Sequence, residues 1–181
     1  MTASGPKETD SKEIRIVDYD PSWPAKFEEH AENIRVALRD MALQIEHIGS
    51  TSVPGLAARP KIDILVVVPD SADEDAYVAL METAGYELRL REPDWHEHRF
   101  FGPPHKDVNV HVVSRGSTEI RRWLVFRDRL RRNADDRRRY EQTKRELARR
   151  KWPDTNAYAA AKSEVIEEII ASPRPSIPRS N

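Results

Sequence analysis

A β-branched and leucine run at residues 62–68, "IDILVVV", constrains the fold more than any other feature of the chain. Such a run of β-branched residues and leucine is typical of a central strand that is buried on both faces. One charged residue, Asp63, lies near its start. Because an unpaired carboxylate is costly to bury, we expect Asp63 to meet a cation or a strong hydrogen-bond donor.

Periodic segments around this run predict a mixed α+β protein. Apolar residues recur at helical spacing from Phe27 to Met41, with Ser22 as the expected cap, and a second helix is expected at residues 72–84, ended by Gly85. Further strands are expected at residues 14–19, 43–48, 86–92, 98–102 and 107–114.

Beyond residue 118 the pattern becomes helical. Three segments follow, of which the middle one carries Tyr140, Lys144 and Leu147 in a polar surrounding, and Asp154 is the expected cap of the third. We therefore expect four parts: a disordered tail at 1–13, an α/β core at 14–118, C-terminal helices packed on the core at 119–171, and a disordered tail at 172–181.

The chain has no cysteine, which excludes disulfides, thiolate nucleophiles and sulfur-ligated metals. A bound metal would need Asp, Glu, His or backbone oxygen as ligands, which favours Mg²⁺ or Mn²⁺, with Zn²⁺ or Fe²⁺ suited to a histidine-rich site. No run approaches the roughly 18 apolar residues of a membrane span, and no signal-peptide pattern begins the chain. We expect a cytoplasmic protein with no membrane partner; the oligomeric state is not predicted.

Charge is segregated along the sequence although the net charge is −1. Residues 1–118 carry 13 Lys and Arg against 21 Asp and Glu, whereas residues 119–151 carry 14 against 6. One interpretation is a solvated helix surface that also docks on an acidic body. The alternative is a basic surface that binds phosphate or nucleic acid, although few aromatic residues accompany it.

The segment "GSTSVPG" at residues 49–55 joins two of the expected strands. A Gly-Ser pair after a strand can offer open backbone N–H groups and a hydroxyl to a phosphate. Arg59 and Lys61 follow the turn and can contact phosphate; alternatively they lie exposed to solvent or form ion pairs with Glu46 or Asp63. The predicted phosphate-binding residues are Gly49, Ser50, Thr51, Ser52, Arg59 and Lys61.

Histidines near the turn suggest a catalytic or metal site. Strand alternation puts Asn109 and His111 on one face, and if the strands are neighbours, His47, Asp63 and His111 converge on one ion. The alternative is that both histidines are bonded within the sheet. Asp63 and His111 are the predicted catalytic pair. On a strand, His96 and His98 would share a face as a proton-transfer pair; otherwise they belong to a polar hairpin. The accessory candidates are Glu46, His96, His98, Arg99 and Asn109.

The stretch "IEHIGSTSVPGLAARPKIDILV" is similar to the signature of the GrpB family, UPF0157, which belongs to the DNA polymerase beta-like nucleotidyltransferase superfamily. The segments "YDPSW", "HRFFG" and "NVHVV" fit the same pattern, so the resemblance covers roughly residues 14–170. It implies a nucleotidyltransferase-like mixed β-sheet with helices on one face, followed by a C-terminal helical segment.

The resemblance also implies a chemistry. In the superfamily a Gly-Ser turn holds the phosphates of a nucleoside triphosphate, and strand carboxylates bind two divalent cations that activate a hydroxyl. Gly49 and Ser50 match the turn. Lys61 stands where the first carboxylate is expected, and Asn109 or His111 stands where the third is expected, so Asp63 is left alone.

Three functions remain open on the sequence. The first is nucleotide- and metal-dependent transfer to an acceptor. The second is a degenerate nucleotide-binding or scaffold module, in which the ammonium of Lys61 replaces a metal ion. The third is RNA binding through the basic helices at 119–151, which would weaken steeply with salt.

Overall fold

The computed structural model describes residues 13–105 and 107–172. The two expected tails, at 1–13 and 172–181, lie outside the described residues except for residues 13 and 172. Within the described ranges, no helix is both long enough and apolar enough to cross a membrane.

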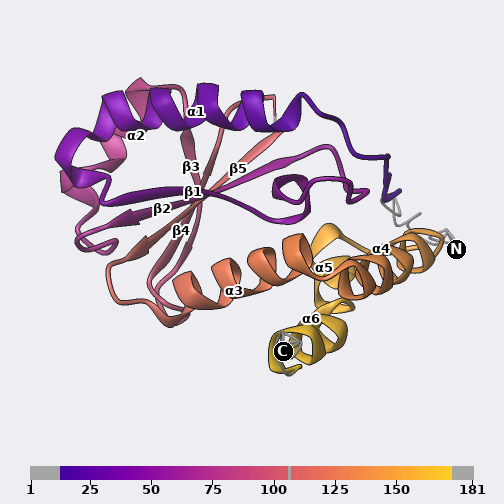
Figure 1. Cartoon of the computed structure of the whole chain (residues 1–181). Coiled ribbons are helices and arrows are strands. Elements are labelled where there is room, and N and C mark those ends of the chain that lie inside the picture. The colour runs from indigo at the N-terminus through magenta and orange to yellow at the C-terminus, as the bar shows by residue number, and fades with distance from the viewer. Residues whose placement is uncertain (1–12, 106, 173–181) are drawn as a thin grey trace, which may run out of the picture.

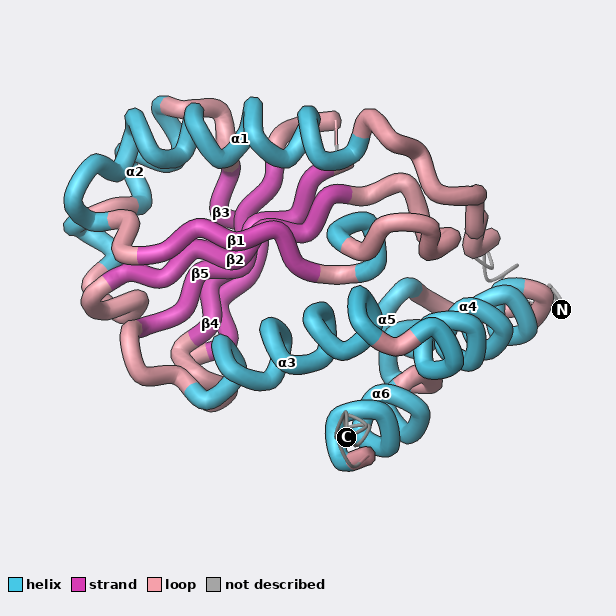
Figure 2. Tube along the Cα trace, viewed as in Figure 1, coloured by secondary structure: helices cyan, strands magenta, loops and turns pink. Residues whose placement is uncertain are grey.

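The structure is built on a five-stranded mixed sheet (Figures 1 and 2). Its strands lie in the order β1-β2-β5-β4-β3, and only β2 and β5 run parallel. Their bounds are Gln44–Ile48 for β1, Ile62–Val68 for β2, Glu87–Glu92 for β3, His98–Gly102 for β4 and Val108–Ser114 for β5. The α+β fold with a central buried strand at 62–68 is thereby confirmed.

One face of the sheet is covered by α1 (Trp23–Leu38) and α2 (Val78–Thr83), as Figure 1 shows. The apolar stripe of α1, including Phe27, Ile34 and Leu38, packs against alternate residues of β2 and β5 in the main core. This stripe is the one expected from helical spacing, and the valines at 108, 110 and 112 share its face.

The opposite face meets α3 (Thr118–Arg132), which is followed by α4 (Ala134–Ala148), α5 (Thr155–Ala160) and α6 (Ser163–Ala171). Trp123 and its neighbours on α3 pack on Leu65, Val67 and Val113 of the sheet. In Figure 2 the last three helices lie beyond the end of β1, beside the turn that follows it. The C-terminal helices therefore approach the sheet where Asp63 lies.

Several local expectations were wrong. Residues 14–19 form no strand, because only Val17 pairs, with Ala58. Ser22 occupies the cap position but makes no capping hydrogen bond; its backbone N–H instead donates to Asp20 Oδ1 over 2.8 Å. The third C-terminal segment is split into α5 and α6 around Lys162. Its cap at Asp154 is confirmed by a 2.7 Å bond from the Ala157 N–H.

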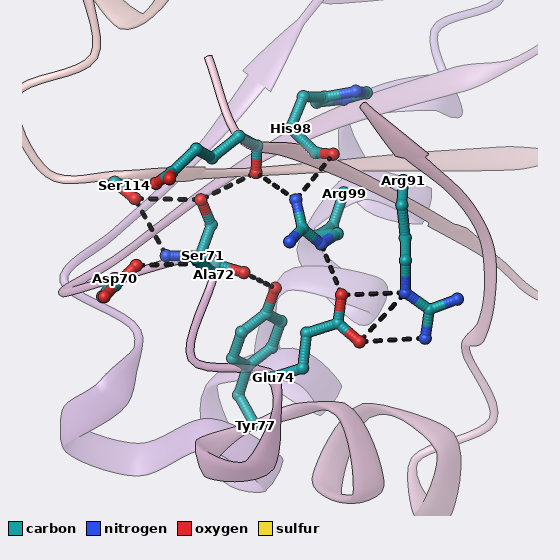
Figure 3. Close-up of polar contacts among 10 residues, drawn as sticks. Asp70, Ser71, Ala72, Glu74, Tyr77, Arg91, His98, Arg99 and Ser114 are labelled. Carbon is teal, nitrogen blue, oxygen red and sulfur yellow. Dashed lines mark hydrogen bonds and ion pairs between the residues drawn. The ribbon is translucent and has the colours of Figure 1, made fainter. Parts of the chain in front are cut away.

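The far edge of the sheet is fixed by a polar network (Figure 3). Glu74, in the short turn Glu74–Ala76, accepts hydrogen bonds from Arg91 and Arg99, while the buried Ser71 hydroxyl donates to the Glu97 carbonyl over 2.8 Å. The Tyr77 hydroxyl donates to the Ser71 carbonyl over 2.7 Å. Arg99, an accessory candidate from the sequence, thus holds the turn between β3 and β4 through its contacts with Glu74 and the Glu97 carbonyl.

Candidate functional site

Asp63 lies at the start of β2, where Ile48 at the end of β1 is its register partner. The Asn109 side-chain amide donates to Asp63 Oδ1 over 2.8 Å, and His111 Nε2 lies 3.7 Å from the same oxygen. Burial acts to raise the pKa of Asp63, but its interactions with His111, Asn109 and Arg59 outweigh burial and hold the pKa below its usual value. The carboxylate is therefore ionised and meets the donor that the sequence led us to expect.

Gly49 is required by its contact with Asp63. Its φ of 71° and ψ of −176° lie in a region that is almost exclusive to glycine. A Cβ at this position would be 2.4 Å from Asp63 Oδ2, which is closer than any stable contact. The absence of a side chain therefore lets the turn lie directly against the carboxylate.

Of the three hydroxyl residues in the turn, Ser50 is partly exposed, whereas Thr51 and Ser52 are buried and hold the shape of the turn. The buried Thr51 hydroxyl donates to the Lys61 carbonyl over 3.1 Å, and the Ser52 hydroxyl donates to the Gly49 carbonyl over 2.6 Å. Ser50 remains partly exposed and interacts with Tyr140 of α4. Among the turn hydroxyls, Ser50 is thus best placed for a ligand.

A small pocket of about 90 Å³ opens beside Asp63, and we call it the cationic pocket. The core contributes Arg59 and Lys61, and the C-terminal helices contribute Lys144 and Lys162. The other lining residues are Ile16, Gly49, Ser50, Thr51, Tyr140 and Tyr158. Four basic side chains around one carboxylate favour an anionic ligand, and both arginine and lysine are suited to binding phosphate.

The charged forms of the two lysines from the C-terminal helices are both disfavoured by their surroundings. Burial, together with the charge of Lys162, lowers the pKa of Lys144 to about 7. Burial and the charge of Arg59 lower the pKa of Lys162 to about 8. Lys144 is almost fully buried and donates to the Ala57 carbonyl. An anion beside these lysines would favour their charged forms and offset this mutual repulsion.

Tyr158 is an unusual residue of the cationic pocket. Its side chain is fully buried, yet its hydroxyl is one of two buried side-chain polar atoms in the described part of the chain without a hydrogen-bond partner. Arg59 and Lys162 lie over its ring, 5.5 Å and 4.7 Å from the ring centre. An unpaired buried hydroxyl is costly, so the fold keeps this tyrosine at some cost in stability.

On the other side of Asp63, four side chains form a continuous row, which we call the histidine chain. Glu92 Oε2 lies 2.7 Å from His98 Nδ1, His98 Nε2 lies 3.1 Å from His111 Nδ1, and His111 Nε2 faces Asp63. From the β3 edge of the sheet inward, the row crosses β3, β4, β5 and β2, which are neighbouring strands in that order. Burial and the neighbouring His111 lower the pKa of His98 to about 4, so its ring is neutral.

A larger groove of about 800 Å³ adjoins the cationic pocket, and both share Gly49, Asp63, Tyr140 and Lys162. We call it the acceptor groove. Its walls include Glu92 and His111 of the histidine chain together with aromatic side chains from the β3–β4 hairpin and α3, namely Trp95, Trp123 and Phe126. Asp63 therefore stands at the junction of an anion-binding pocket and an aromatic groove.

The proposed three-ligand metal set is not brought together. His47 stacks on Phe27, with ring centres 4.7 Å apart, on the α1 face of the sheet, whereas Asp63 and His111 lie on the α3 face. Burial lowers the pKa of His47 to about 4, and its Nε2 pairs with the Thr51 hydroxyl. In residues 13–105 and 107–172, no group of three or more His, Asp or Glu side chains could hold a metal ion. The protein residues present thus do not fit a two-metal centre.

His96 and Glu46 also lie apart from Asp63 and the histidine chain. His96 sits in the hairpin turn with a φ of 55°, so it does not share a strand face with His98, and its Nε2 lies 3.7 Å from Glu119. Glu46 forms a 2.8 Å ion pair with Arg127 of α3. Neither side chain reaches the cationic pocket.

The basic residues of α3 and α4 are largely engaged within the protein. Arg127 pairs with Glu46 and also donates to the His47 carbonyl, and Arg131 donates to the Ser52 carbonyl. Further pairs join Arg129 to Asp136, Arg139 to Glu168, and Arg145 to Asp18 and Glu141. These basic residues therefore pair with the core, through Glu46 and Asp18, and with acidic residues of the C-terminal helices themselves.

Comparison with known proteins identifies the family. The model of the GrpB protein family matches residues 13–172. The chain belongs to the GrpB family. Its sequence is 54% identical to a UPF0157 protein of Halalkalibacterium halodurans, over 87% of this chain and 80% of that protein. A UPF0157 protein of Streptomyces coelicolor is 48% identical, over 87% of this chain and 82% of that protein.

A solved structure supports the membership. The crystal structure of conserved protein GrpB from Enterococcus faecalis has a TM-score of 0.74 to this chain, with 35% identity. The match covers 86% of this chain and 97% of the Enterococcus chain. The similarity therefore includes both the sheet and the C-terminal helices that complete the cationic pocket.

Sequence reasoning missed four residues that the structure brings to the site of this GrpB-family chain. It did not select Lys144, Tyr158 or Lys162, which complete the cationic pocket, nor Glu92, which ends the histidine chain. One signal was available, because Lys144 shares the helical stripe of Tyr140 and Leu147 and is buried with them. A lysine in an apolar stripe indicates a charged group that needs a partner.

Proposed function

We propose that this GrpB-family chain binds a nucleoside triphosphate and transfers its nucleotidyl group to an acceptor. The phosphates occupy the cationic pocket and the acceptor occupies the acceptor groove. The observation that carries this proposal is the convergence of four cationic side chains beside the ionised Asp63, at the turn that Gly49 keeps open. Site chemistry, with the family resemblance, supports it more than fold alone would.

In this reaction an acceptor hydroxyl oxygen forms a bond to the α-phosphorus. The bond from that phosphorus to the bridging oxygen of the β-phosphate breaks, and pyrophosphate leaves with the electron pair. The proton of the hydroxyl passes to a base at the junction of pocket and groove, where Asp63 and His111 lie. Arg59, Lys61, Lys144 and Lys162 stabilise the charge on the leaving pyrophosphate.

The protein's own cations take the charge-neutralising role that the superfamily pattern assigns to divalent cations. Lys61 lies where that pattern has a carboxylate, and Asn109 replaces another, so we derive no step through a metal ion. Nucleotide binding is accordingly expected to persist when divalent ions are removed by a chelator.

A thermal-shift screen tests the binding step. The full chain is melted with each common nucleoside triphosphate and with inorganic phosphate, in Mg²⁺, Mn²⁺ or EDTA. Dephospho-CoA joins the panel because a protein named dephospho-CoA kinase from Mycolicibacterium paratuberculosis is 30% identical, over 82% of this chain and 43% of that protein. At a hundredfold excess over Kd, binding adds about 2.7 kcal/mol of stability, or roughly 5–10 °C.

The matched variants are Arg59→Gln, in the pocket, and Lys26→Gln, exposed on α1. Arg59→Gln should remove most of the shift, and Lys26→Gln should keep all of it. No stabilisation by any triphosphate, or an equal shift in the Arg59 variant, would refute the proposal.

The second candidate is a binding module without turnover. It is favoured by the single carboxylate at Asp63, because Lys61 and Asn109 replace the others. Pyrophosphate release with a panel of hydroxyl-bearing acceptors separates the two functions. Transfer predicts release that Asp63→Asn abolishes while ATP still stabilises the variant; the binding module predicts stabilisation with no release from the wild type.

A further inference from the structure

The histidine chain determines where its protons lie. An ionised carboxylate can only accept a hydrogen bond, so the 2.7 Å contact with Glu92 requires the proton of neutral His98 to be on Nδ1. His98 Nε2 then has no proton and must accept. The 3.1 Å contact with His111 Nδ1 therefore requires a proton on that atom.

This arrangement leaves His111 Nε2 without a proton whenever the ring is neutral. Nε2 lies 3.7 Å from Asp63 Oδ1, too far for a direct hydrogen bond, and it faces the junction of the cationic pocket and the acceptor groove. The opposite tautomers would set His98 Nδ1 and Glu92 Oε2, both acceptors, 2.7 Å apart. The observed distances therefore select one assignment.

We infer that Glu92 and His98 are positioning residues that hold His111 in its Nδ1–H tautomer, so that Nε2 is the base that accepts a proton from an acceptor hydroxyl. The inference deepens the proposed transfer and rests on it for the identity of the acceptor. His111 touches the reacting group, whereas His98 and Glu92 act only through His111.

The surroundings keep both rings in place. Trp123 lies 5.5 Å from His111 and 6.4 Å from His98 between ring centres, and Trp95 lies 5.1 Å from His98. His96 and Glu97, just before β4, adopt positive φ angles of 55° and 49°, which are uncommon for residues other than glycine. The packed rings and this tight turn aim His98 at Glu92 and His111 together.

The proton transfer can be written in full. The hydroxyl proton moves to His111 Nε2 as the oxygen bonds to the α-phosphorus, and the ring becomes a cation. Asp63 then faces that cation and stabilises it, while Nδ1–H continues to donate to His98. The arrangement follows the general rule that a base is oriented by a group behind it.

Imidazole ¹⁵N NMR on histidine-labelled full chain at pH 8 tests this assignment directly, because a nitrogen that lacks a proton is shifted far downfield. The expected spectrum has His98 and His111 both protonated on Nδ1 only. His98→Phe keeps an aromatic ring but removes the acceptor, and should move His111 to the Nε2–H tautomer. Glu92→Gln, whose amide can donate or accept, should give His98 a mixture of tautomers.

Glu87→Gln, on the same strand β3, is the matched control and should leave both rings unchanged. A wild-type His111 protonated on Nε2, or unchanged tautomers in the Glu92 variant, would overturn the inference. The outcome is separable from the proposed function. Correct tautomers without nucleotide binding would refute the function alone, whereas wrong tautomers with nucleotide binding intact would refute the inference alone.

Discussion

The two sides of Asp63 are built in different ways. The histidine chain comes from neighbouring strands of one sheet, whereas the cationic pocket is completed by Lys144 and Lys162 from the helical segment that follows the sheet in the sequence. The strand side is centred on the neutral ring of His98 and ordered by hydrogen bonds, whereas the helix side brings several basic side chains together. In the function that we propose, proton transfer is therefore assigned to the sheet, and anion binding to its junction with the C-terminal helices.

The largest expected effect is on acid stability. The pKa values of His98 and His47 are each lowered to about 4, so between the ordinary histidine pKa and pH 4 the unfolded chain binds more protons than the folded one. Stability is therefore full above about pH 6.5 and falls as the pH decreases, by roughly 3 kcal/mol for each histidine. Urea unfolding at pH 7 and pH 4.5 measures this loss.

His98→Phe should remove about half of that pH dependence because His47 remains on the other face of the sheet. If the variant and the wild type lose stability in parallel, the histidine chain is not the acid-sensitive side of the site.

Gly49→Ala changes the residue that lies against Asp63, where the histidine chain and the cationic pocket meet. Its Cβ would clash with Asp63 Oδ2 at a backbone conformation reserved for glycine, so we expect a loss of about 3 kcal/mol in the free energy of unfolding together with loss of nucleotide binding. Gly116→Ala is the control, because its φ is also positive, at 91°, but its surroundings are open. It should cost about 1 kcal/mol. Equal costs would mean that the contact with Asp63 is unimportant.

Binding of triphosphate in the cationic pocket should weaken as the pH rises above 7. Burial and the charge of Arg59 lower the pKa of Lys162 to about 8, and an anion binds its charged form. Affinity for triphosphate should therefore fall between pH 7 and pH 9, by about tenfold from Lys162 alone. Calorimetric titration of ATP across this range provides the measurement. Lys162→Gln should bind more weakly at pH 7 and show a flatter profile, and an unchanged profile would contradict the assignment.

The smallest expected effect is a difference in unfolding free energy between variants of two buried tyrosines, Tyr77 and Tyr158. Tyr77→Phe leaves the Ser71 carbonyl without its donor and should cost about 1–3 kcal/mol. Tyr158→Phe removes a hydroxyl that has no partner among the described residues, so its stability should be unchanged or slightly raised. Its affinity for triphosphate should nevertheless fall, as measured by the same titration. A stability loss in Tyr158→Phe equal to that of Tyr77→Phe would show that its hydroxyl serves the fold.

The strand side of the site could be predicted because local rules govern it. Alternation along residues 108–114 puts Asn109 and His111 on one face, and the apolar run at 62–68 puts Asp63 beside them. His47 was misplaced because its face depends on register: Ile48 pairs with Asp63, so the residue before it points to the other side.

The helix side could not be predicted from local pattern. Lys162 lies in a break between α5 and α6 that the continuous apolar spacing concealed. Its position depends on how Tyr158 of α5 packs against Leu147 and how α6 packs against Tyr140. Other contacts of this segment join residues far apart in the chain, such as Lys144 and Ala57, which are 87 positions apart. Tertiary docking, not propensity, brings these cations to the Gly49 turn.

A crystal structure of the full chain with a non-hydrolysable nucleoside triphosphate analogue, grown in EDTA, tests the central claim most directly. The account predicts phosphate density in the cationic pocket, within hydrogen-bond distance of Arg59, Lys162 and the Tyr158 hydroxyl. Phosphates bound elsewhere, or bound in the pocket only when divalent ions are supplied, would contradict it.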